Sequence, residues 1–287
     1  MSNFIIALNN FTIYQNGSMH SMHSDYQYGY VFPFEFIHNY ADKTRWFQRN
    51  WYHSITLSLI YFTVILILQR IMRDRKPFCL KNSLFFWNLG LCIFSTMGFI
   101  RFTENLLFEA GDKGLQYVVC YSWNTEGPAI FWSLMFLISK VFEFGDTVFI
   151  VLRKKPLIFL HYYHHAAVLV YTVHAAAEHT ASGAIFISMN FFVHSIMYGY
   201  YAISSLQLFR MPKYISITIT SLQLLQMVIG VSTTLYVYYI KTNLDVPCQQ
   251  SMANLYLAFL MYLSFGILFA YFFFNAYCKK QNKLKTQ

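Results

Sequence analysis

Apolar stretches of about twenty residues recur along this sequence, separated by short polar connections. A helix needs about twenty residues to cross roughly 30 Å of hydrocarbon, because each residue adds 1.5 Å. The stretches therefore predict seven transmembrane helices, and the segment before the third one could supply a further partial helix, at 102–127. The predicted spans are 54–72, 83–101, 128–151, 157–177, 184–206, 214–240 and 252–277.

Composition and proline placement favour the same fold class. Of all residues, 56% are hydrophobic and only 11% are charged, whereas soluble domains carry roughly 25% charged residues. Proline lacks an N–H and is tolerated at helix starts and in connections rather than in helix interiors. Such positions hold Pro77, Pro128, Pro156, Pro212 and Pro247. We therefore expect an all-α membrane protein whose seven helices form a bundle.

The basic residues predict how the chain is oriented in the membrane. Cytosolic connections carry an excess of Lys and Arg, and basic groups follow the first, third, fifth and seventh spans while the other connections are acidic or neutral. This pattern predicts a lumenal N-terminus and a cytosolic C-terminus. It also accounts for the net charge of +9 without a nucleic-acid partner.

The N-terminal region gives mixed signals on this orientation. Lys43, Arg45 and Arg49 precede the first span, on the side that the alternation assigns to the lumen. Two N-glycosylation sequons begin at Asn10 and Asn16 and require a lumenal N-terminus to be used. We therefore keep the N-terminus lumenal and expect glycosylation at these two asparagines.

Two of the five cysteines fall in predicted lumenal connections. These are Cys120 and Cys248, whereas Cys79 and Cys278 border the cytosol and Cys92 lies in a span. The lumen is oxidising, which favours disulfides. We therefore expect a disulfide between Cys120 and Cys248, with two free cysteines as the alternative.

Ionisable and polar residues are concentrated inside four of the predicted spans. Each is expensive to place in hydrocarbon and is therefore a candidate functional residue. Lys140, Glu143 and Asp146 share one face of the third span, where attraction between opposite charges could offset part of the burial cost. The next three spans contribute His161, His164, His165, Asn190, His194, Tyr198, Tyr201, Thr220, Gln223 and Gln226.

Counting along the helices places these groups at similar depths. At 1.5 Å per residue they lie roughly 8–24 Å inside the cytosolic basic anchors. One shared cavity would satisfy them together, so we expect a polar chamber that opens to the cytosol. For Gln223 and Gln226, ordinary hydrogen bonding between helices remains an alternative.

Four segments resemble the signature boxes of the ELO family of very-long-chain fatty acid elongases. They occur in the family's order and cover the chain from about residue 50 onward. Their sequences are KVFEFGDT at 140–147, HYYHH at 161–165, NFFVHSIMYGYY at 190–201 and TSLQLLQ at 220–226. The combination of four boxes is far more specific than a single HxxHH motif.

This resemblance implies a fold, a reaction and a location. It implies a seven-helix bundle enclosing a narrow acyl tunnel, and a 3-ketoacyl-CoA synthase of the endoplasmic reticulum. Such an enzyme condenses a long-chain acyl-CoA with malonyl-CoA to give a 3-ketoacyl-CoA, CO2 and free CoA, without a further cofactor or metal. His161 and Tyr163 resemble members acting on saturated and monounsaturated chains, and branched chains remain open. Other fatty acid elongation enzymes and membrane lipid are the expected partners.

The histidines suit this chemistry. A neutral imidazole can attack a thioester, so His164 is the expected nucleophile. Alternatively, the histidines serve as general bases or oxyanion donors while the malonyl-derived enolate attacks the bound thioester directly. The sequence leaves both routes open. His161 and His165 are expected to orient His164, and His194 with Asn190 to stabilise the enolate.

The remaining candidate residues are expected to bind substrate. Polar box residues shape the chamber: Lys140, Glu143, Asp146, Thr147, Tyr198, Tyr201, Gln223 and Gln226. Basic residues at the cytosolic mouth suit the phosphates of CoA, although the positive-inside pattern explains them equally well. They are Arg153, Lys154, Lys155, Arg210 and Lys213.

Two other protein classes share some of these features. Di-iron membrane desaturases and hydroxylases also use HxxHH boxes, but they draw histidine ligands from several clusters, and only one cluster lies in these spans. A seven-helix receptor matches the span number and the N-terminal sequons, but it explains the ionisable chamber less well.

The chain is thus divided into three predicted regions. Residues 1–50 form a lumenal N-terminal segment, 51–278 the seven-helix elongase domain and 279–287 a cytosolic basic tail. In the tail, Lys283 and Lys285 resemble the dilysine retrieval signals of endoplasmic reticulum membrane proteins.

Overall fold

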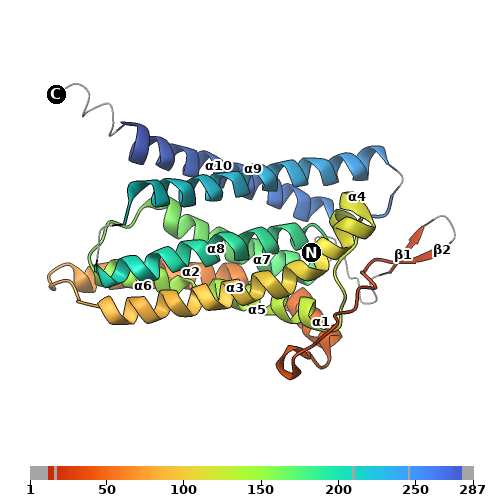
Figure 1. The fold of residues 1–287 in the computed structure, drawn as a ribbon, viewed down its shortest axis with the longest axis horizontal. Coiled ribbons are helices and arrows are strands. Elements are labelled where there is room, and N and C mark those ends of the chain that lie inside the picture. The colour runs from red at the N-terminus through yellow and green to blue at the C-terminus, as the bar shows by residue number, and fades with distance from the viewer. Residues whose placement is uncertain (1–11, 16–17, 209–210, 245, 280–287) are drawn as a thin grey trace.

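Helices dominate the structure, a computed structural model that describes residues 12–15, 18–208, 211–244 and 246–279. The long helices lie side by side along the longest axis of the molecule (Figure 1). A short antiparallel hairpin of β1 (Thr12–Gln15) and β2 (Ser18–Ser21) precedes them. The predicted helical class is confirmed, and the hairpin is an addition that the sequence pattern did not predict.

Most helices match the predicted apolar stretches to within a few residues. In chain order the elements after the hairpin are η1 (Pro33–Glu35), α1 (Tyr40–Asn50), α2 (His53–Met72), α3 (Lys81–Asp112), α4 (Gly114–Cys120), α5 (Pro128–Phe142), α6 (Phe144–Leu152), α7 (Phe159–Glu178), α8 (Gly183–Leu206), α9 (Lys213–Asn243), α10 (Met252–Phe273) and the π-helical turn η2 (Phe274–Cys278).

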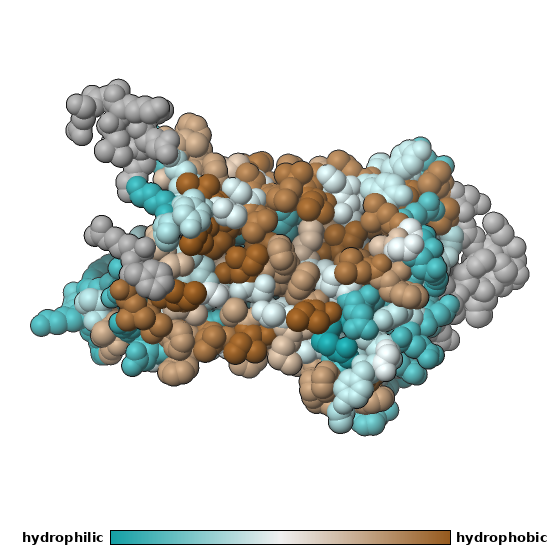
Figure 2. Space-filling view, in the orientation of Figure 1, coloured by the Kyte–Doolittle hydropathy of each residue, from teal (hydrophilic) through white to brown (hydrophobic). Residues whose placement is uncertain are grey.

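The surface of the bundle is apolar along its middle. Within the described chain, four helices are long and apolar enough to cross a membrane: α2, α3, α9, and α10 together with η2. Large apolar side chains such as Leu66 and Ile267 point outward from these helices, with 66% and 62% of their surface exposed. Figure 2 shows hydrophobic residues over the central part of the visible face and hydrophilic ones mainly towards its two ends. Lipid is the environment that suits such a surface.

The third predicted span is broken in the structure. A single helix over 128–151 was expected, but α5 and α6 meet at Glu143, so this prediction is wrong in its continuity. The N–H of Asp146 donates to the Glu143 carbonyl oxygen (3.1 Å), a three-residue step that interrupts the regular four-residue pattern. Gly145 follows, and a Cβ there would lie only 2.5 Å from the Trp87 ring. The break therefore lets Trp87 of α3 pack closely beside Asp146.

The second predicted span is too short. Helix α3 continues past residue 101 to Asp112, and α4 occupies part of the connection where a further partial helix was expected. The predicted apolar stretch ended at Arg101, and the extension beyond it carries Glu104 and Glu109. Arg101 forms a salt bridge with Glu104 (3.2 Å), so pairing lowers the cost of these charges in the helix.

The two ends of the bundle differ in construction. At one end, called here the α1 end, lie α1, α4 and the connection between α9 and α10 (Figure 1). At the other, the α6 end, lie α6, the connection between α2 and α3, and the end of α10. Helices α9 and α10 form a hairpin that packs against α7 and α8.

A disulfide joins two segments at the α1 end. It links Cys120 of α4 to Cys248 in the connection between α9 and α10, with the two Cα atoms 4.1 Å apart. This is the pairing expected from the sequence. Next to it, the N–H of Gln249 donates to the Cys120 carbonyl oxygen (2.9 Å), and the Gln249 side chain donates to the carbonyl oxygen of Glu178 (2.9 Å). The α9–α10 hairpin is therefore tied to α4 and to the last turn of α7.

The segment before α1 is fixed by a buried carboxylate. Glu35 of η1 is fully buried and accepts hydrogen bonds from Arg101 Nη2 (2.7 Å) and from Trp132 Nε1 (2.8 Å). Burial opposes ionisation of Glu35, but the hydrogen bonds from Arg101 and Trp132 hold its pKa below the usual value. This ion pair connects the N-terminal segment to both α3 and α5.

Replacing this carboxylate should weaken the fold. We expect Glu35→Gln to lower the free energy of unfolding by about 2–3 kcal/mol, because Arg101 loses its buried partner. Since the pKa of Glu35 is depressed, its contribution is present above the usual carboxyl pKa and is lost as the pH falls through the depressed value. Thermal unfolding of detergent-purified protein at neutral and acid pH measures both effects. Glu104→Gln, at a more exposed partner of Arg101, is the control, and an equal loss from both variants would contradict the assignment.

Candidate active site

Three histidines project from the first turns of α7. The helix starts at Phe159, shortly after Pro156, and the N–H of His161 donates to the Ile158 carbonyl oxygen (3.1 Å) in its first turn. Spacing of three and four residues places the side chains on one side of the helix. The ring centroids of His161 and His165 are 4.5 Å apart, and those of His164 and His165 are 5.4 Å apart. The HYYHH segment thus forms a compact imidazole cluster.

The members of this cluster are held in different ways. His161 Nε2 lies 2.9 Å from Thr147 Oγ1, which in turn lies 2.6 Å from the hydroxyl of Tyr61 on α2. His165 is buried, whereas His164 is half-buried and its ring centroid lies 4.8 Å from that of Phe265 on α10. Hydrogen bonds therefore orient His161, while His164 is positioned by ring contacts and remains accessible.

A buried ion pair stands behind His194 and Asn190 of α8. Lys140 Nζ donates to Glu143 Oε1 (2.7 Å) and to Asn190 Oδ1 (2.8 Å). Glu143 Oε1 also lies 3.6 Å from His194 Nδ1, and Asn190 Nδ2 lies 3.3 Å from His194 Nε2. The ammonium group additionally sits 4.2 Å from the centre of the Phe136 ring. These contacts fix the Asn190 amide and the His194 ring relative to each other.

Asp146 is held by two hydrogen-bond donors from neighbouring helices. Trp87 Nε1 of α3 donates to Oδ1 (2.7 Å), and the hydroxyl of Tyr198 of α8 donates to Oδ2 (2.7 Å). Both donors reach the carboxylate because the chain breaks at Glu143 and Gly145 admits the Trp87 ring. A carboxylate is thereby fixed at the edge of the histidine region.

These groups surround one cavity of about 630 Å³. It is lined by α3, α6, α7, α8, α9, α10 and η2, so the polar groups of four predicted spans do meet, as counting along the helices indicated. Its lining includes the polar residues Asn88, Asp146, Arg153, His161, His164, His165, Asn190, His194, Tyr198, Tyr201, Ser204, Thr220, Gln223, Gln226 and Tyr277.

Several expected site residues do not line this cavity. Lys140 and Glu143 contact Asn190 and His194 from behind, and Thr147 is fully buried against His161. They therefore support the lining side chains instead of offering the direct contact with substrate that was expected.

The basic residues near the α6 end are spread out. Arg153 lines the cavity, but Lys154, Lys155 and Lys213 are exposed outside it, and Lys154 Nζ donates to the Arg73 carbonyl oxygen (2.9 Å). Arg210, the sequon residues Asn10 and Asn16, and most of the tail at 279–287 lie outside the described residues.

Sequence reasoning missed four residues of the site. Asn88 was detectable as an isolated polar residue inside an apolar span, whereas Trp87, Tyr61 and Tyr277 gave no signal, because aromatic residues are abundant in this chain. Tyr277 reaches the cavity from the π-helical turn η2, and its hydroxyl donates to the Ser216 carbonyl oxygen (3.3 Å). Such turns re-aim side chains and are common at functional sites.

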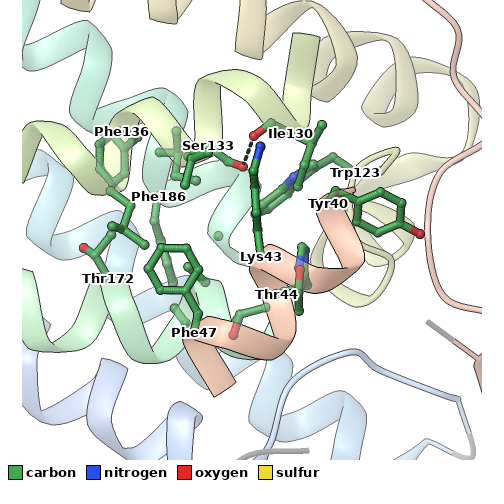
Figure 3. Close-up of a pocket in the computed structure, with 18 of the residues that line it drawn as sticks. Tyr40, Lys43, Thr44, Phe47, Trp123, Ile130, Ser133, Phe136, Thr172 and Phe186 are labelled. Carbon is green, nitrogen blue, oxygen red and sulfur yellow. Dashed lines mark hydrogen bonds between the residues drawn. The ribbon is translucent and has the colours of Figure 1, made fainter. Parts of the chain in front are cut away.

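A second, smaller cavity of about 80 Å³ lies nearer the α1 end. Figure 3 shows Lys43 and Phe47 of α1 directed towards Ser133 and Phe186 of the bundle, whereas Tyr40 points outward. The other walls come from α5, α7 and α8. On α8 the two cavities are one turn apart, because Ile187 lines the smaller cavity and Asn190 the larger.

The fold and the site together define a class of protein. Among the described residues, no group of three or more His, Cys, Asp or Glu side chains is arranged to hold a metal ion. The cavity instead presents imidazoles and a fixed carboxylate inside an apolar bundle. This arrangement is typical of an integral membrane enzyme that acts on a lipid substrate.

Comparison with known proteins identifies the family. Residues 46–285 match the ELO family model, described as the GNS1/SUR4 family. The chain is 50% identical to the Caenorhabditis elegans protein "Putative fatty acid elongase 4", covering 99% of this chain and 97% of that protein. It is 42% identical to "Very long chain fatty acid elongase 6" of Drosophila melanogaster (87% and 80% covered) and 39% identical to "Very long chain fatty acid elongase 3" of Homo sapiens (86% and 90%).

The chain therefore belongs to the ELO family and is a fatty acid elongase, a condensing acyltransferase of lipid metabolism. The resemblance of its four boxes is confirmed over nearly the whole predicted helical domain. The desaturase and receptor alternatives are not favoured, because the family match includes every predicted span.

The buried ion pair offers a test of how the site is supported. We expect Lys140→Met to lower the free energy of unfolding by about 3–5 kcal/mol, because Glu143 is left buried without its cation. The double variant Lys140→Met/Glu143→Gln should recover much of this stability, because no unpaired charge remains buried. Its activity should stay low, since His194 has lost the carboxylate that it contacts. Thermal unfolding of purified protein measures the first effect and acyl-CoA turnover the second. Lys154→Met, at an exposed lysine, is the control. If Lys140→Met were as stable as the parent protein, the supporting role of the Lys140–Glu143 pair would be contradicted.

Proposed function

We propose that this chain condenses a long-chain acyl-CoA with malonyl-CoA to give a 3-ketoacyl-CoA, CO2 and free CoA. The observation that carries the proposal is the cavity of about 630 Å³, which gathers four histidines and Asp146 inside an apolar bundle. The names of its relatives as fatty acid elongases support the same reaction. No further cofactor is required, because the histidines and the two CoA thioesters supply the reacting groups.

His164 is the proposed nucleophile. It lines the cavity, it is the more accessible of the adjacent pair His164 and His165, and no described residue donates a hydrogen bond to its ring. A ring nitrogen would attack the thioester carbonyl and release the CoA thiolate, giving an acyl-imidazole. Malonyl-CoA then loses CO2, and its carbanion attacks the acyl-imidazole and frees the ring.

The neighbouring groups take different parts in these steps. His194 and Asn190, fixed by Lys140 and Glu143, are placed to stabilise the enolate formed on decarboxylation. His161 and His165 orient the His164 ring. In the alternative route the same groups stabilise a direct attack of the enolate on the thioester, and the adduct experiment below separates the two routes.

The CoA moieties are proposed to enter at the α6 end. Arg153 lines the cavity there and suits a phosphate group, and the exposed Lys154, Lys155 and Lys213 lie in or beside the adjoining connections. Arg210 is proposed to share this role. Asp146, Tyr198, Tyr201, Gln223 and Gln226 would contact the thioester and malonyl groups deeper in the cavity.

The acyl chain is proposed to extend from the histidines towards the α1 end in a narrow tunnel. The smaller cavity lies in that direction, one turn of α8 beyond Asn190, and would receive the methyl end of the chain. Its walls are largely apolar, as an alkyl chain requires. Saturated, monounsaturated or branched chains are the proposed substrates.

We place the enzyme in the endoplasmic reticulum membrane with the α1 end lumenal and the α6 end cytosolic. Counting α5 and α6 as one broken span gives seven crossings: α2, α3, α5–α6, α7, α8, α9 and α10. This orientation exposes the disulfide and the sequons at Asn10 and Asn16 to the oxidising, glycosylating lumen. Association with other enzymes of fatty acid elongation and with membrane lipid completes the proposal.

Condensation by microsomes tests the proposed site. With labelled malonyl-CoA and a panel of long-chain acyl-CoAs, we expect His164→Ala and His165→Ala each to reduce product at least a hundredfold, in the range typical of catalytic acid–base groups. His53→Ala, at an exposed histidine at the start of α2, should retain parental activity at equal protein level. Full activity of both cluster variants would show that the site is assigned wrongly.

The nature of the intermediate can be measured directly. When purified enzyme is mixed with acyl-CoA alone and quenched rapidly, we expect an acyl group on His164, together with one equivalent of free CoA. Peptide mass spectrometry locates the adduct, and His164→Ala serves as the control. Its absence at times shorter than one turnover would favour direct attack of the enolate.

A further inference from the structure

A tyrosine hydroxyl is buried in the apolar interior without a partner. Tyr171 of α7 is only 8% exposed, and no described residue forms a hydrogen bond with its hydroxyl oxygen. It belongs to a largely apolar core cluster in which its ring centroid lies 6.5 Å from that of Phe186, and the other tyrosine of the cluster is Tyr262. Leaving a buried hydroxyl unpaired is unfavourable, because the group has lost its hydrogen bonds to water. A phenylalanine would pack in the same space without this cost, so the hydroxyl requires an explanation.

The position of Tyr171 relates it to the proposed path of the acyl chain. Tyr171 lies seven residues after His164, which places the two side chains on the same face of α7, two turns apart. Tyr171 also lines the smaller cavity, which Figure 3 shows between α1 and the side chains of Phe136, Thr172 and Phe186. A chain that runs from His164 into this cavity therefore passes Tyr171.

The distance between His164 and Tyr171 along α7 determines which part of the acyl chain lies beside the Tyr171 hydroxyl. Two turns of α7 rise about 10 Å, the length of roughly eight extended carbon–carbon bonds. Both side chains lean towards the start of the helix, so the offset between their ends is similar. The Tyr171 hydroxyl thus meets the middle of a long chain, far from both the thioester and the methyl end.

We propose that Tyr171 is a specificity-determining residue that donates a hydrogen bond to the π face of a cis double bond near the middle of the acyl chain. This inference rests on the proposed function, because it needs the acyl chain to follow the path from His164 to the smaller cavity. A saturated chain offers the hydroxyl no acceptor. An unsaturated chain with its double bond near carbon 9 offers a weak one and also bends the chain there. Such interactions are worth about 0.5–1 kcal/mol, which corresponds to a two- to five-fold preference.

The test compares two acyl-CoAs of equal length, one saturated and one with a cis double bond at carbon 9. For the parent enzyme and for Tyr171→Phe, the ratio of kcat/KM for the unsaturated to the saturated substrate is measured. We expect Tyr171→Phe to lower this ratio about two- to five-fold, mainly by weakening use of the unsaturated chain, because the hydrogen bond to its double bond is lost. Tyr256→Phe, on the exposed surface of α10, is the matched control and should leave the ratio unchanged.

A second comparison needs only the parent enzyme. Moving the double bond from carbon 9 to carbon 5 or carbon 13 should remove the preference over the saturated chain. If the ratio does not depend on the position of the double bond, or if active Tyr171→Phe keeps the parental ratio, the inference is overturned. If the parent enzyme condenses none of these substrates, the proposed function itself fails, which is a different result.

Discussion

The salt bridge between Lys140 and Glu143 is the interaction on which the interior of this protein depends. Both side chains are almost completely buried, and the cost of removing two charges from water is offset by their attraction and by further hydrogen bonds, among them one from Ser139 Oγ to Glu143 Oε1 (3.2 Å). The ammonium group therefore recruits Asn190, and the carboxylate approaches His194. One ion pair in this way fixes the end of α5 against α8 and determines where two lining side chains of the cavity point.

The break between α5 and α6 lies at the same residue. Glu143 separates the two helices, and its side chain faces Lys140 of α5. Asp146 then meets Trp87 and Tyr198 instead of the ion pair. Two carboxylates three residues apart thus have separate partners, one a cation and the other a pair of neutral donors. This separation keeps like charges apart in a region of low dielectric constant.

Much of the fold was predictable because hydrocarbon imposes strict rules on sequence. Apolar length gave α2, α7, α8, α9 and α10 nearly to the residue. The errors occurred where a local contact overrides the pattern. Arg101 and Glu104 ended the predicted second span, yet ion pairs carry α3 through them. The residues just after the break at Glu143, Gly145 and Asp146, contact Trp87 from another helix, and apolar periodicity contains no information about such contacts.

The candidate site was predictable in most of its ionisable and amide members but not in its aromatic members or its arrangement. Intramembrane histidines, carboxylates and amides are conspicuous in a sequence, so their common cavity could be expected from depth alone. Which of them line the cavity could not be predicted. Lys140 and Thr147 are as noticeable in the sequence as Asn190 and His161, but they contact these two residues instead of lining the cavity. Aromatic residues such as Tyr61 and Tyr277 could not be recognised as site residues, because this sequence has many similar aromatic residues. Each combines an apolar ring, which any lipid-facing or core position accepts, with one hydroxyl that matters only where a second helix brings a partner to it.

The two kinds of support within the histidine cluster also have a chemical consequence. Thr147, which is itself hydrogen-bonded to Tyr61, forms a hydrogen bond with Nε2 of His161, so this ring nitrogen is already committed to the protein. Ring contacts with His165 and Phe265 hold His164 without engaging its nitrogens. A nucleophile needs a fixed orientation and an uncommitted lone pair, and edge contacts between aromatic rings supply the first without consuming the second. The apolar residues around His164 are therefore as much a part of the proposed reactive centre as the polar ones, because they orient the ring of the proposed nucleophile and leave its lone pair available.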